Sequence, residues 1–97
     1  MTALHDSRIL VLHSDDNIAV AACELAAGTQ VQIGTASLTV REHIDVGHKF
    51  ALRTIQPGEK IMKYRAPIGS ATRLIQAGEY VHTHNMQSDY LPTYTLA

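Results

Sequence analysis

Short apolar segments separated by glycine turns dominate the pattern of hydrophobic and polar positions along this chain. One turn unit recurs, with an aliphatic residue, two intervening residues, a glycine, two more residues and an apolar residue. Its four copies are "LAAGTQV" (25–31), "IDVGHKF" (44–50), "IQPGEKI" (55–61) and "IQAGEYV" (75–81). A glycine at a fixed place in a short connection is typical of a turn position with a positive φ angle. The pattern therefore predicts four similar turns.

The distances between these turns favour an all-β domain. The glycines are Gly28, Gly47, Gly58 and Gly78, so the gaps are 19, 11 and 20 residues, which is too irregular for a solenoid. Many short apolar segments joined by tight turns are typical of strands. The expected strands lie in "SRILVLH" (7–13), in a hairpin about Gly34 (31–40), in "HKFALRTI" (48–55), in "EKIMKY" (59–64) and in "EYVHTH" (79–84). Pro67 and Gly69 predict a further break.

The segment "SDDNIAVAACELAAG" (14–28) allows two interpretations. Its Ser/Asp start is suited to cap a helix, and its alanines favour one. "NIAVAA" (17–22) is equally typical of a buried strand, and local propensity alone does not separate the two.

Size and composition indicate one small domain with few special features. The chain has 97 residues and a net charge of −1, with eight basic and nine acidic residues dispersed along it. No basic stripe indicates a nucleic-acid partner, and no apolar run is long enough to predict a membrane span. The N-terminus lacks the pattern of a secretory signal, so we expect a cytoplasmic location. The single cysteine, Cys23, is interpreted as a buried and inert thiol.

The chain divides into three parts on these patterns. Residues 1–8 are expected to be an N-terminal extension, and residues 9–85 form the β domain. Residues 86–97, "MQSDYLPTYTLA", show neither strand alternation nor helix capping. They are interpreted as a tail or linker that packs on a partner or on the rest of a longer polypeptide.

Two histidines near the end, His82 and His84, are the first candidate for chemistry. On a strand they share one face, so they can bind one metal ion or, when protonated, one anion. Alternatively, they are ordinary edge-strand residues, because a metal centre needs three or four ligands and two histidines do not complete one.

Other polar residues have a functional and a structural interpretation. His48 and Lys49 can neutralise a carboxylate or an enediolate, or they are only polar turn residues. Lys63 and Tyr64 can supply a further cation and a hydroxyl, or they pack at a strand edge. In "HSDDN" (13–17), Asp and Asn are expected to make side-chain turns to the backbone, although carboxylates beside a histidine can also assist a metal. His5 and His43 have no such context.

Taken together, these motifs resemble the SAF-type N-terminal domain of the altronate dehydratase family. The resemblance covers residues 9–85 and rests on "HSDDNIAVA", "LAAGT", "IDVGHKFAL", "IQPGEKIMKY", "PIGSAT" and "IQAGEYVHTHN". It implies a small β-clip (SAF-like) fold and a strand at 17–22. It also implies a hydro-lyase that converts D-altronate to 2-keto-3-deoxy-D-gluconate with a divalent metal, usually iron. In this family most of the catalytic machinery lies in a large region, which is therefore the expected partner besides the sugar-acid substrate.

With this resemblance the residues receive expected roles. His48 and Lys49 are predicted to be catalytic, and His82 and His84 to be metal ligands. The predicted substrate-binding residues are Lys63, Tyr64 and Asn85. The chain alone is expected to be inactive and to bind no metal stably. The alternatives are a non-catalytic module that binds a carbohydrate or a partner, and the small subunit of a related lyase such as sulfolactate sulfo-lyase.

One position departs from the family pattern. Arg65 follows "KY", where the family usually has glycine. If this position has a positive φ angle, arginine bears a strain that glycine would not. Otherwise Arg65 adds a cation beside Lys63.

Overall fold

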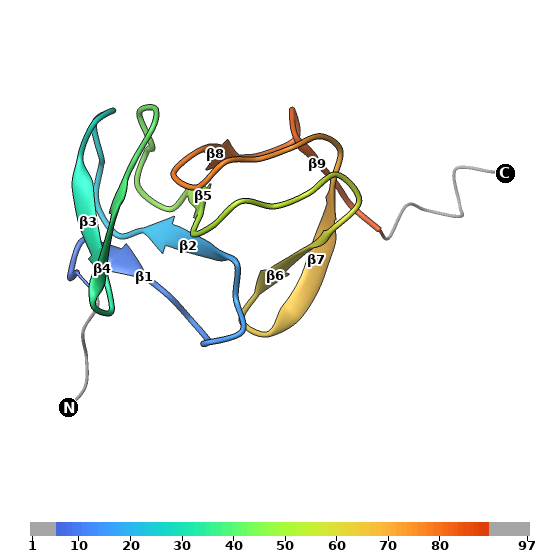
Figure 1. Ribbon diagram of the computed structural model, residues 1–97, viewed down its shortest axis with the longest axis horizontal. Coiled ribbons are helices and arrows are strands. Elements are labelled where there is room, and N and C mark those ends of the chain that lie inside the picture. Colours follow the sequence, from blue (N-terminus) through green and yellow to red (C-terminus); the bar gives the residue numbers. More distant parts are fainter. Residues whose placement is uncertain (1–5, 90–97) are drawn as a thin grey trace, which may run out of the picture.

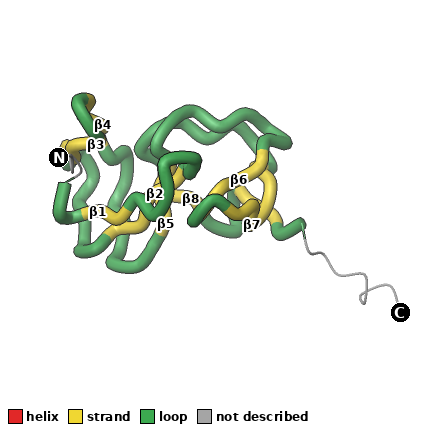
Figure 2. Tube along the Cα trace, turned by 90° about the horizontal axis from the view of Figure 1, so that it is seen from below, coloured by secondary structure: helices red, strands yellow, loops and turns green. Residues whose placement is uncertain are grey.

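Short strands joined by turns and loops form the described part of the chain. The structure is a computed structural model that describes residues 6–89, and these residues form no helix (Figures 1 and 2). No helix among them could therefore cross a membrane. The nine strands are β1 (Ile9–Leu10), β2 (Ile18–Ala21), β3 (Gln30–Ile33), β4 (Ala36–Thr39), β5 (Lys49–Ala51), β6 (Lys60–Lys63), β7 (Ala66–Ala71), β8 (Tyr80–Val81) and β9 (Met86–Gln87). The all-β prediction is confirmed, and 17–22 contains a strand, β2.

Three small antiparallel sheets lie along the long axis of the molecule. The largest has the order β1-β2-β5-β8, and it lies between the β3–β4 hairpin and the three-stranded sheet β6-β7-β9 (Figure 1). The predicted hairpin about Gly34 is confirmed as β3–β4.

The central sheet has a hydrophobic cluster on each face, because its strands alternate side chains between the two faces. The first cluster consists of Ile9, Ala19, Ala21, Leu25, Val31, Val40, Ile44 and Phe50. The second consists of Ile18, Ala51, Ile55, Ile61, Ala71, Ile75 and Val81. β2 contributes to both, since Ile18 and Ala19 point to opposite sides. The central sheet therefore joins the two halves of the core.

The four turn units form as predicted. Their glycines have φ angles of 84° to 89°. Each turn is closed by a backbone hydrogen bond, for example from the Glu79 N–H to the Gln76 carbonyl at 3.0 Å. The units associate in pairs through their first aliphatic residues, by isolated antiparallel bridges between Leu25 and Ile44 and between Ile55 and Ile75.

Two expectations from the sequence are wrong. Pro67 and Gly69 do not break the chain, because β7 continues through both of them. A register shift between Ile61 and Met62 lets the pairing of β6 with β7 accommodate Pro67, which has no backbone N–H. Cys23 is exposed rather than buried, because it follows the end of β2.

Residues near both ends of the described part pack on the domain. The Asp6 N–H donates to the Gln32 carbonyl at 3.0 Å. Within the segment expected to be a tail, Met86 and Gln87 form β9 and pair with β7. The Asp89 carboxylate accepts hydrogen bonds from Lys60 at 2.7 Å and from Ser70 at 2.8 Å. The rest of the predicted tail, residues 90–97, lies outside the described residues.

The β6–β7 connection places two non-glycine residues at positive φ. Tyr64 has a φ of 56° and Arg65 a φ of 65°, as in the mirror-image turns of two-residue hairpins. The Asp16 carboxylate accepts hydrogen bonds from both backbone N–H groups at 2.7 Å. Arg65 thus occupies the strained conformation considered above. Asp16 therefore binds the backbone of a turn that is distant in the sequence. The prediction that its side chain binds the backbone of its own turn is wrong.

Replacing Arg65 by glycine is expected to stabilise the chain by about 0.5 to 1 kcal/mol. The change removes the cost of ~1–2 kcal/mol for a left-handed side-chain-bearing residue, and the greater entropy of unfolded glycine offsets part of the gain. Urea unfolding should give a higher midpoint with an unchanged slope. Arg65→Lys, which keeps the cation and the Cβ atom, should leave the midpoint unchanged. A gain in the lysine variant equal to that of the glycine variant would contradict this explanation.

Candidate functional site

Three histidines and a tyrosine gather beside β5 and β8. The Tyr80 hydroxyl lies 2.8 Å from Nδ1 of His48. The ring of Tyr80 stacks on His82 with a centroid distance of 5.5 Å and an interplanar angle of 11°. It also lies 5.5 Å from the ring of His84, and His48 lies 6.1 Å from His82. We call these four residues the histidine–tyrosine cluster.

The backbone of the last turn unit explains this arrangement. Tyr80 begins β8, which ends at Val81, and residues 82–85 form a turn in which the Asn85 and Met86 N–H groups donate to the His82 carbonyl at 3.0 Å and 2.9 Å. This turn brings the rings of His82 and His84 close to the ring of Tyr80. His82 and His84 are exposed, while His48 and Tyr80 are half-buried. Imidazoles at an accessible surface are available to bind a ligand or to exchange protons.

Asn85 holds the loop of residues 82–85, which we call the histidine loop, through its buried side chain. Its side chain is only 1% exposed. Its Oδ1 accepts a hydrogen bond from the His82 N–H at 2.9 Å, and its Nδ2 donates to the Tyr80 carbonyl at 2.8 Å. Both polar atoms are thus occupied. This arrangement favours a positioning role for Asn85, in place of the direct substrate contact expected from the sequence.

Lys49 and Lys63 form a second group, which we call the lysine pair. Burial lowers the pKa of the Lys49 ammonium, and the nearby positive charge of Lys63 lowers it further. Within residues 6–89, neither ammonium has a carboxylate or a hydrogen-bond acceptor as partner. Two unneutralised cations close to one another favour an anion between them.

The lysine pair and the histidine–tyrosine cluster lie on different faces of the central sheet. Lys49 pairs with Val20 on one side and with Val81 on the other, so these three residues share a face. Phe50 pairs with Tyr80, which places Tyr80 and its partner His48 on the opposite face. The structure therefore separates His48 from Lys49, which the sequence suggested as one cation pair.

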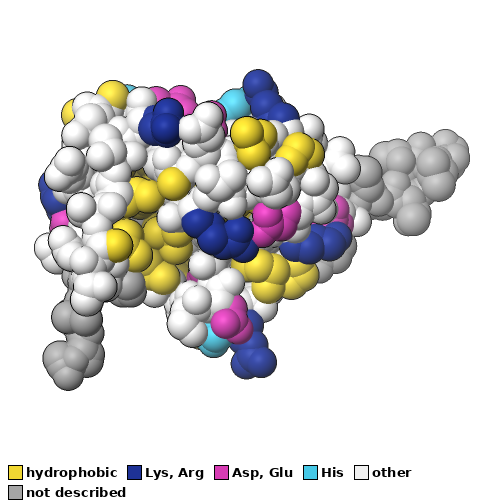
Figure 3. Space-filling view, viewed as in Figure 1, with side chains coloured by type: hydrophobic (Ala, Val, Ile, Leu, Met, Phe, Trp, Pro, Cys, Tyr) yellow, Lys and Arg dark blue, Asp and Glu magenta, His cyan; other side chains and the backbone are white. Residues whose placement is uncertain are grey.

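The face that carries Lys49 is partly apolar and open. In register with Lys49 and Val20 lies Leu10, which is 48% exposed. Figure 3 shows Lys and Arg side chains beside hydrophobic and acidic ones in the middle of the visible face. Tyr64 is 71% exposed in the turn that follows Lys63. The lysine pair and Tyr64 thus provide cations and a hydroxyl at an accessible surface.

Within residues 6–89, the predicted metal ligands His82 and His84 do not belong to a group of three converging ligand atoms. His82 and His84 lie on one loop. Neither His48 nor another described His, Cys, Asp or Glu residue completes a group of three ligand atoms with them. A metal ion at this place would take imidazole nitrogens from this loop and its remaining ligands from another region.

The sequence did not predict the contacts of three residues that organise these groups. Tyr80 precedes His82 by two positions, so the same alternation that pairs the histidines could have included it. Asp16 and Asn17 are joined to residues more than 40 positions away, and no local pattern predicts such partners.

The fold and these two polar groups define a small all-β domain with an accessible cationic surface. A family model described as "Altronate/galactarate dehydratase SAF domain" matches residues 7–89. The chain is 44% identical over 78 residues to altronate dehydratase from Escherichia coli (strain K12) and 35% identical to altronate dehydratase from Bacillus subtilis (strain 168). These alignments cover 80% of the chain but only 16% of either dehydratase.

A third relative has a similar size to this chain. The (2R)-sulfolactate sulfo-lyase subunit alpha from Chromohalobacter salexigens is 33% identical over 86 residues, which cover 92% of that subunit. On the match of the family model, the chain belongs to the altronate/galactarate dehydratase SAF domain family.

Proposed function

We propose that this chain is the SAF part of an altronate dehydratase-type hydro-lyase, and that a larger region or subunit completes its active site. The proposed reaction converts D-altronate to 2-keto-3-deoxy-D-gluconate and water. The family match and the small share of the dehydratases that the chain covers support this division of labour.

The observation that carries the proposal is the lysine pair. A sugar acid carries a carboxylate, and the half-buried Lys49 and the nearby Lys63 offer two cations that have no partner among residues 6–89. Binding of a carboxylate would relieve the repulsion between the two ammonium groups. In a partly desolvated place such a contact is stronger than in water.

The chemistry of dehydration makes use of this charge. A base removes the proton from C2, the hydroxyl group leaves C3 with a proton as water, and the resulting enol becomes the 2-keto acid. Negative charge builds up on the carboxylate as the C2 proton departs. Cations fixed beside that carboxylate stabilise the enediolate, because they need not reorganise during the reaction.

The histidine–tyrosine cluster lies on the opposite face of the central sheet from the lysine pair, and it is proposed to contact the larger region at a second place. In the complete enzyme, His82 and His84 would offer imidazole nitrogens to a divalent metal, with iron as the proposed ion. Such an ion supplies Lewis-acid chemistry when bound. Asn85 holds the histidine loop in position, and the Tyr80 hydroxyl fixes the ring of His48.

Titration of the chain with D-altronate, followed by NMR of lysine side chains, tests the role of the lysine pair. Binding should raise the pKa of Lys49 toward its ordinary value, since an anion favours the charged form. Lys63→Gln should also raise it, because a neighbouring positive charge is lost. Lys49→Gln should weaken altronate binding about tenfold, which corresponds to ~1.4 kcal/mol.

Lys60→Gln is the matched control, since it removes a lysine that already pairs with Asp89. Altronate affinity should not change in this variant. Equal weakening in the Lys60 and Lys49 variants would show that altronate affinity depends only on the net charge of the chain. That result would contradict a specific site. Dehydration of D-altronate by the purified chain alone would contradict the need for a larger region.

A second candidate is the small subunit of a sulfo-lyase. The size match with the sulfolactate sulfo-lyase subunit alpha favours it, because there a chain of similar length is a separate subunit. Sulfolactate is also a carboxylate, so the lysine pair suits both substrates. Tighter binding of (2R)-sulfolactate than of D-altronate would favour this candidate.

A further inference from the structure

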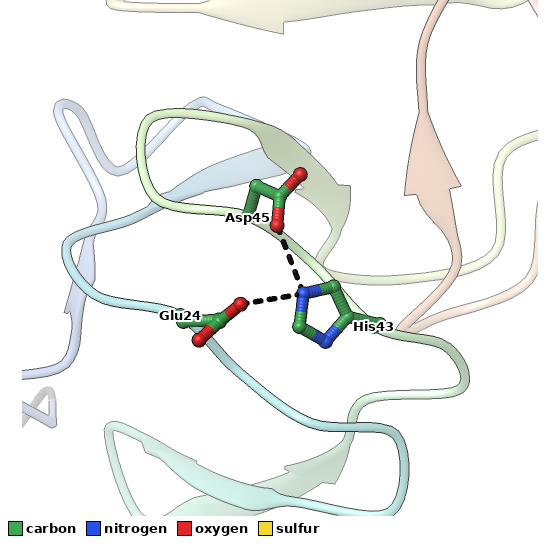
Figure 4. Close-up of side chains that lie close together, drawn as sticks. All are labelled: Glu24, His43 and Asp45. Atoms are coloured by element: carbon green, nitrogen blue, oxygen red, sulfur yellow. Dashed lines mark hydrogen bonds and ion pairs between the residues drawn. The ribbon is translucent and has the colours of Figure 1, made fainter.

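A second cluster of potential ligands lies away from both groups described above. Glu24, His43 and Asp45 meet at the surface where the first two turn units join (Figure 4). Nε2 of His43 lies 2.9 Å from Oε2 of Glu24 and 2.8 Å from Oδ1 of Asp45. We call these residues the carboxylate–histidine triad.

The backbone places the triad in a defined way. Leu25 and Ile44 form an antiparallel bridge with hydrogen bonds of 2.9 Å and 2.8 Å in both directions. Their side chains are buried in the first hydrophobic cluster. Residues next to buried positions point outward, so Glu24 lies opposite Asp45 on the solvent side. His43 and Asp45 flank Ile44 and share that side.

The two carboxylates of the triad favour a bound cation. Two carboxylates directly opposite one another across a strand pair repel. A proton on Nε2 of His43 offsets the repulsion incompletely, because a single N–H cannot point at both carboxylate oxygens. A metal ion can bind all three atoms at once. Metal bonds of about 2.0–2.2 Å to nitrogen and oxygen require ligand atoms roughly 3.3 Å apart in a tetrahedral site. Exposed side chains reach this spacing by small movements.

The equivalent bridge in the other half of the molecule lacks these groups. Ile55 and Ile75 form the same kind of bridge. The positions corresponding to the triad hold Thr54, Leu74 and Gln76, none of which is ionisable. The turn units alone therefore do not require a carboxylate–histidine triad.

We propose that Glu24, His43 and Asp45 bind a first-row divalent cation of the zinc class. One imidazole nitrogen and two carboxylate oxygens suit such an ion, and a fourth position stays open for water or for a group from another molecule. This site is separate from the histidine loop, and it does not depend on the proposed dehydratase function.

Titration of the chain with Co²⁺, followed by visible absorption, and with Zn²⁺, followed by calorimetry, tests the site. One equivalent should bind. His43→Gln should lower the affinity at least about tenfold, and Glu24→Gln and Asp45→Asn should each lower it as well. Zn²⁺ should raise the thermal unfolding temperature of the unmodified chain but not that of His43→Gln.

The matched control is His13→Gln, which removes a histidine that lies beside Asp15 and outside the triad. Its affinity for Co²⁺ and Zn²⁺ should equal that of the unmodified chain. Backbone amide spectra show whether each variant keeps its fold. Unchanged metal binding in a folded His43→Gln variant, or its loss in the His13 variant, would overturn the proposal.

Discussion

Alanine at position 78 is expected to destabilise the chain by about 4 kcal/mol or more, a loss far above that of an ordinary substitution. Gly78 has a φ of 87°, and a Cβ atom there would lie 2.1 Å from the Thr39 carbonyl oxygen. The surrounding backbone cannot easily move away. The Gly78 N–H donates to the Ala51 carbonyl at 2.8 Å, and the Arg41 N–H donates to the Gly78 carbonyl at 2.9 Å.

The same change at Gly58 is the matched control. Gly58 has a φ of 84° at the equivalent place of its turn unit, but no atom lies within 4 Å of its would-be Cβ. Gly58→Ala should therefore cost only the ~1–2 kcal/mol of a left-handed alanine. Urea unfolding of both variants measures the difference. Equal losses would show that the contact with Thr39 does not matter.

The local turns of this fold could be predicted from the sequence, but the packing of those turns on distant segments could not. The four turn units are local, so their glycines predicted the positive φ angles and the strands that follow. The packing of Gly78 against Thr39 joins residues far apart in the chain. No pattern along the sequence distinguishes Gly78 from Gly58, although their environments differ completely.

Pro67 and Gly69 illustrate the same limit. Both residues commonly interrupt strands, and the local rule predicted a break. Gly69 lies instead within β7, where a Cβ atom would meet the Gln87 carbonyl oxygen at 2.3 Å. Close approach of β9 explains this glycine, and β9 falls in the segment that the sequence suggested as a tail.

The grouping of the candidate residues could not be predicted from the sequence. The expected strand over 79–84 is wrong in its second half, because β8 ends at Val81 and a turn over residues 82–85 places His82 and His84 near Tyr80. His48 and Lys49 are neighbours in sequence, yet the pairing of β5 with β8 directs them to opposite faces. Lys63 approaches Lys49 only because β6 packs near the central sheet, which depends on contacts between distant segments.

Asn17 provides one of those contacts, and its replacement by alanine is expected to cost about 2–4 kcal/mol. Its side chain is 1% exposed. Nδ2 donates to the Lys60 carbonyl at 2.8 Å, and Oδ1 accepts from the Met62 N–H at 2.7 Å. Alanine would leave both of these backbone groups of β6 without their partner, and unpaired polar groups carry a large desolvation penalty. A lower urea midpoint measures the loss.

The position of Lys63 relative to Lys49 should change in the same variant. Asn17 joins the start of β2 to β6, and Lys63 ends β6. Once this tie is lost, Lys63 is expected to move away from Lys49, and the pKa of Lys49 should then rise toward its ordinary value. NMR titration of the lysine side chains measures that shift.

Asn85→Ala is the matched control, because it removes an equally buried amide with two backbone hydrogen bonds inside its own loop. It should lower stability and disturb the signals of His82, but it should leave the pKa of Lys49 unchanged. An unchanged Lys49 pKa in Asn17→Ala, or an equal change in Asn85→Ala, would show that Asn17 does not set the geometry of the lysine pair. The fold would then position the two cations by packing alone.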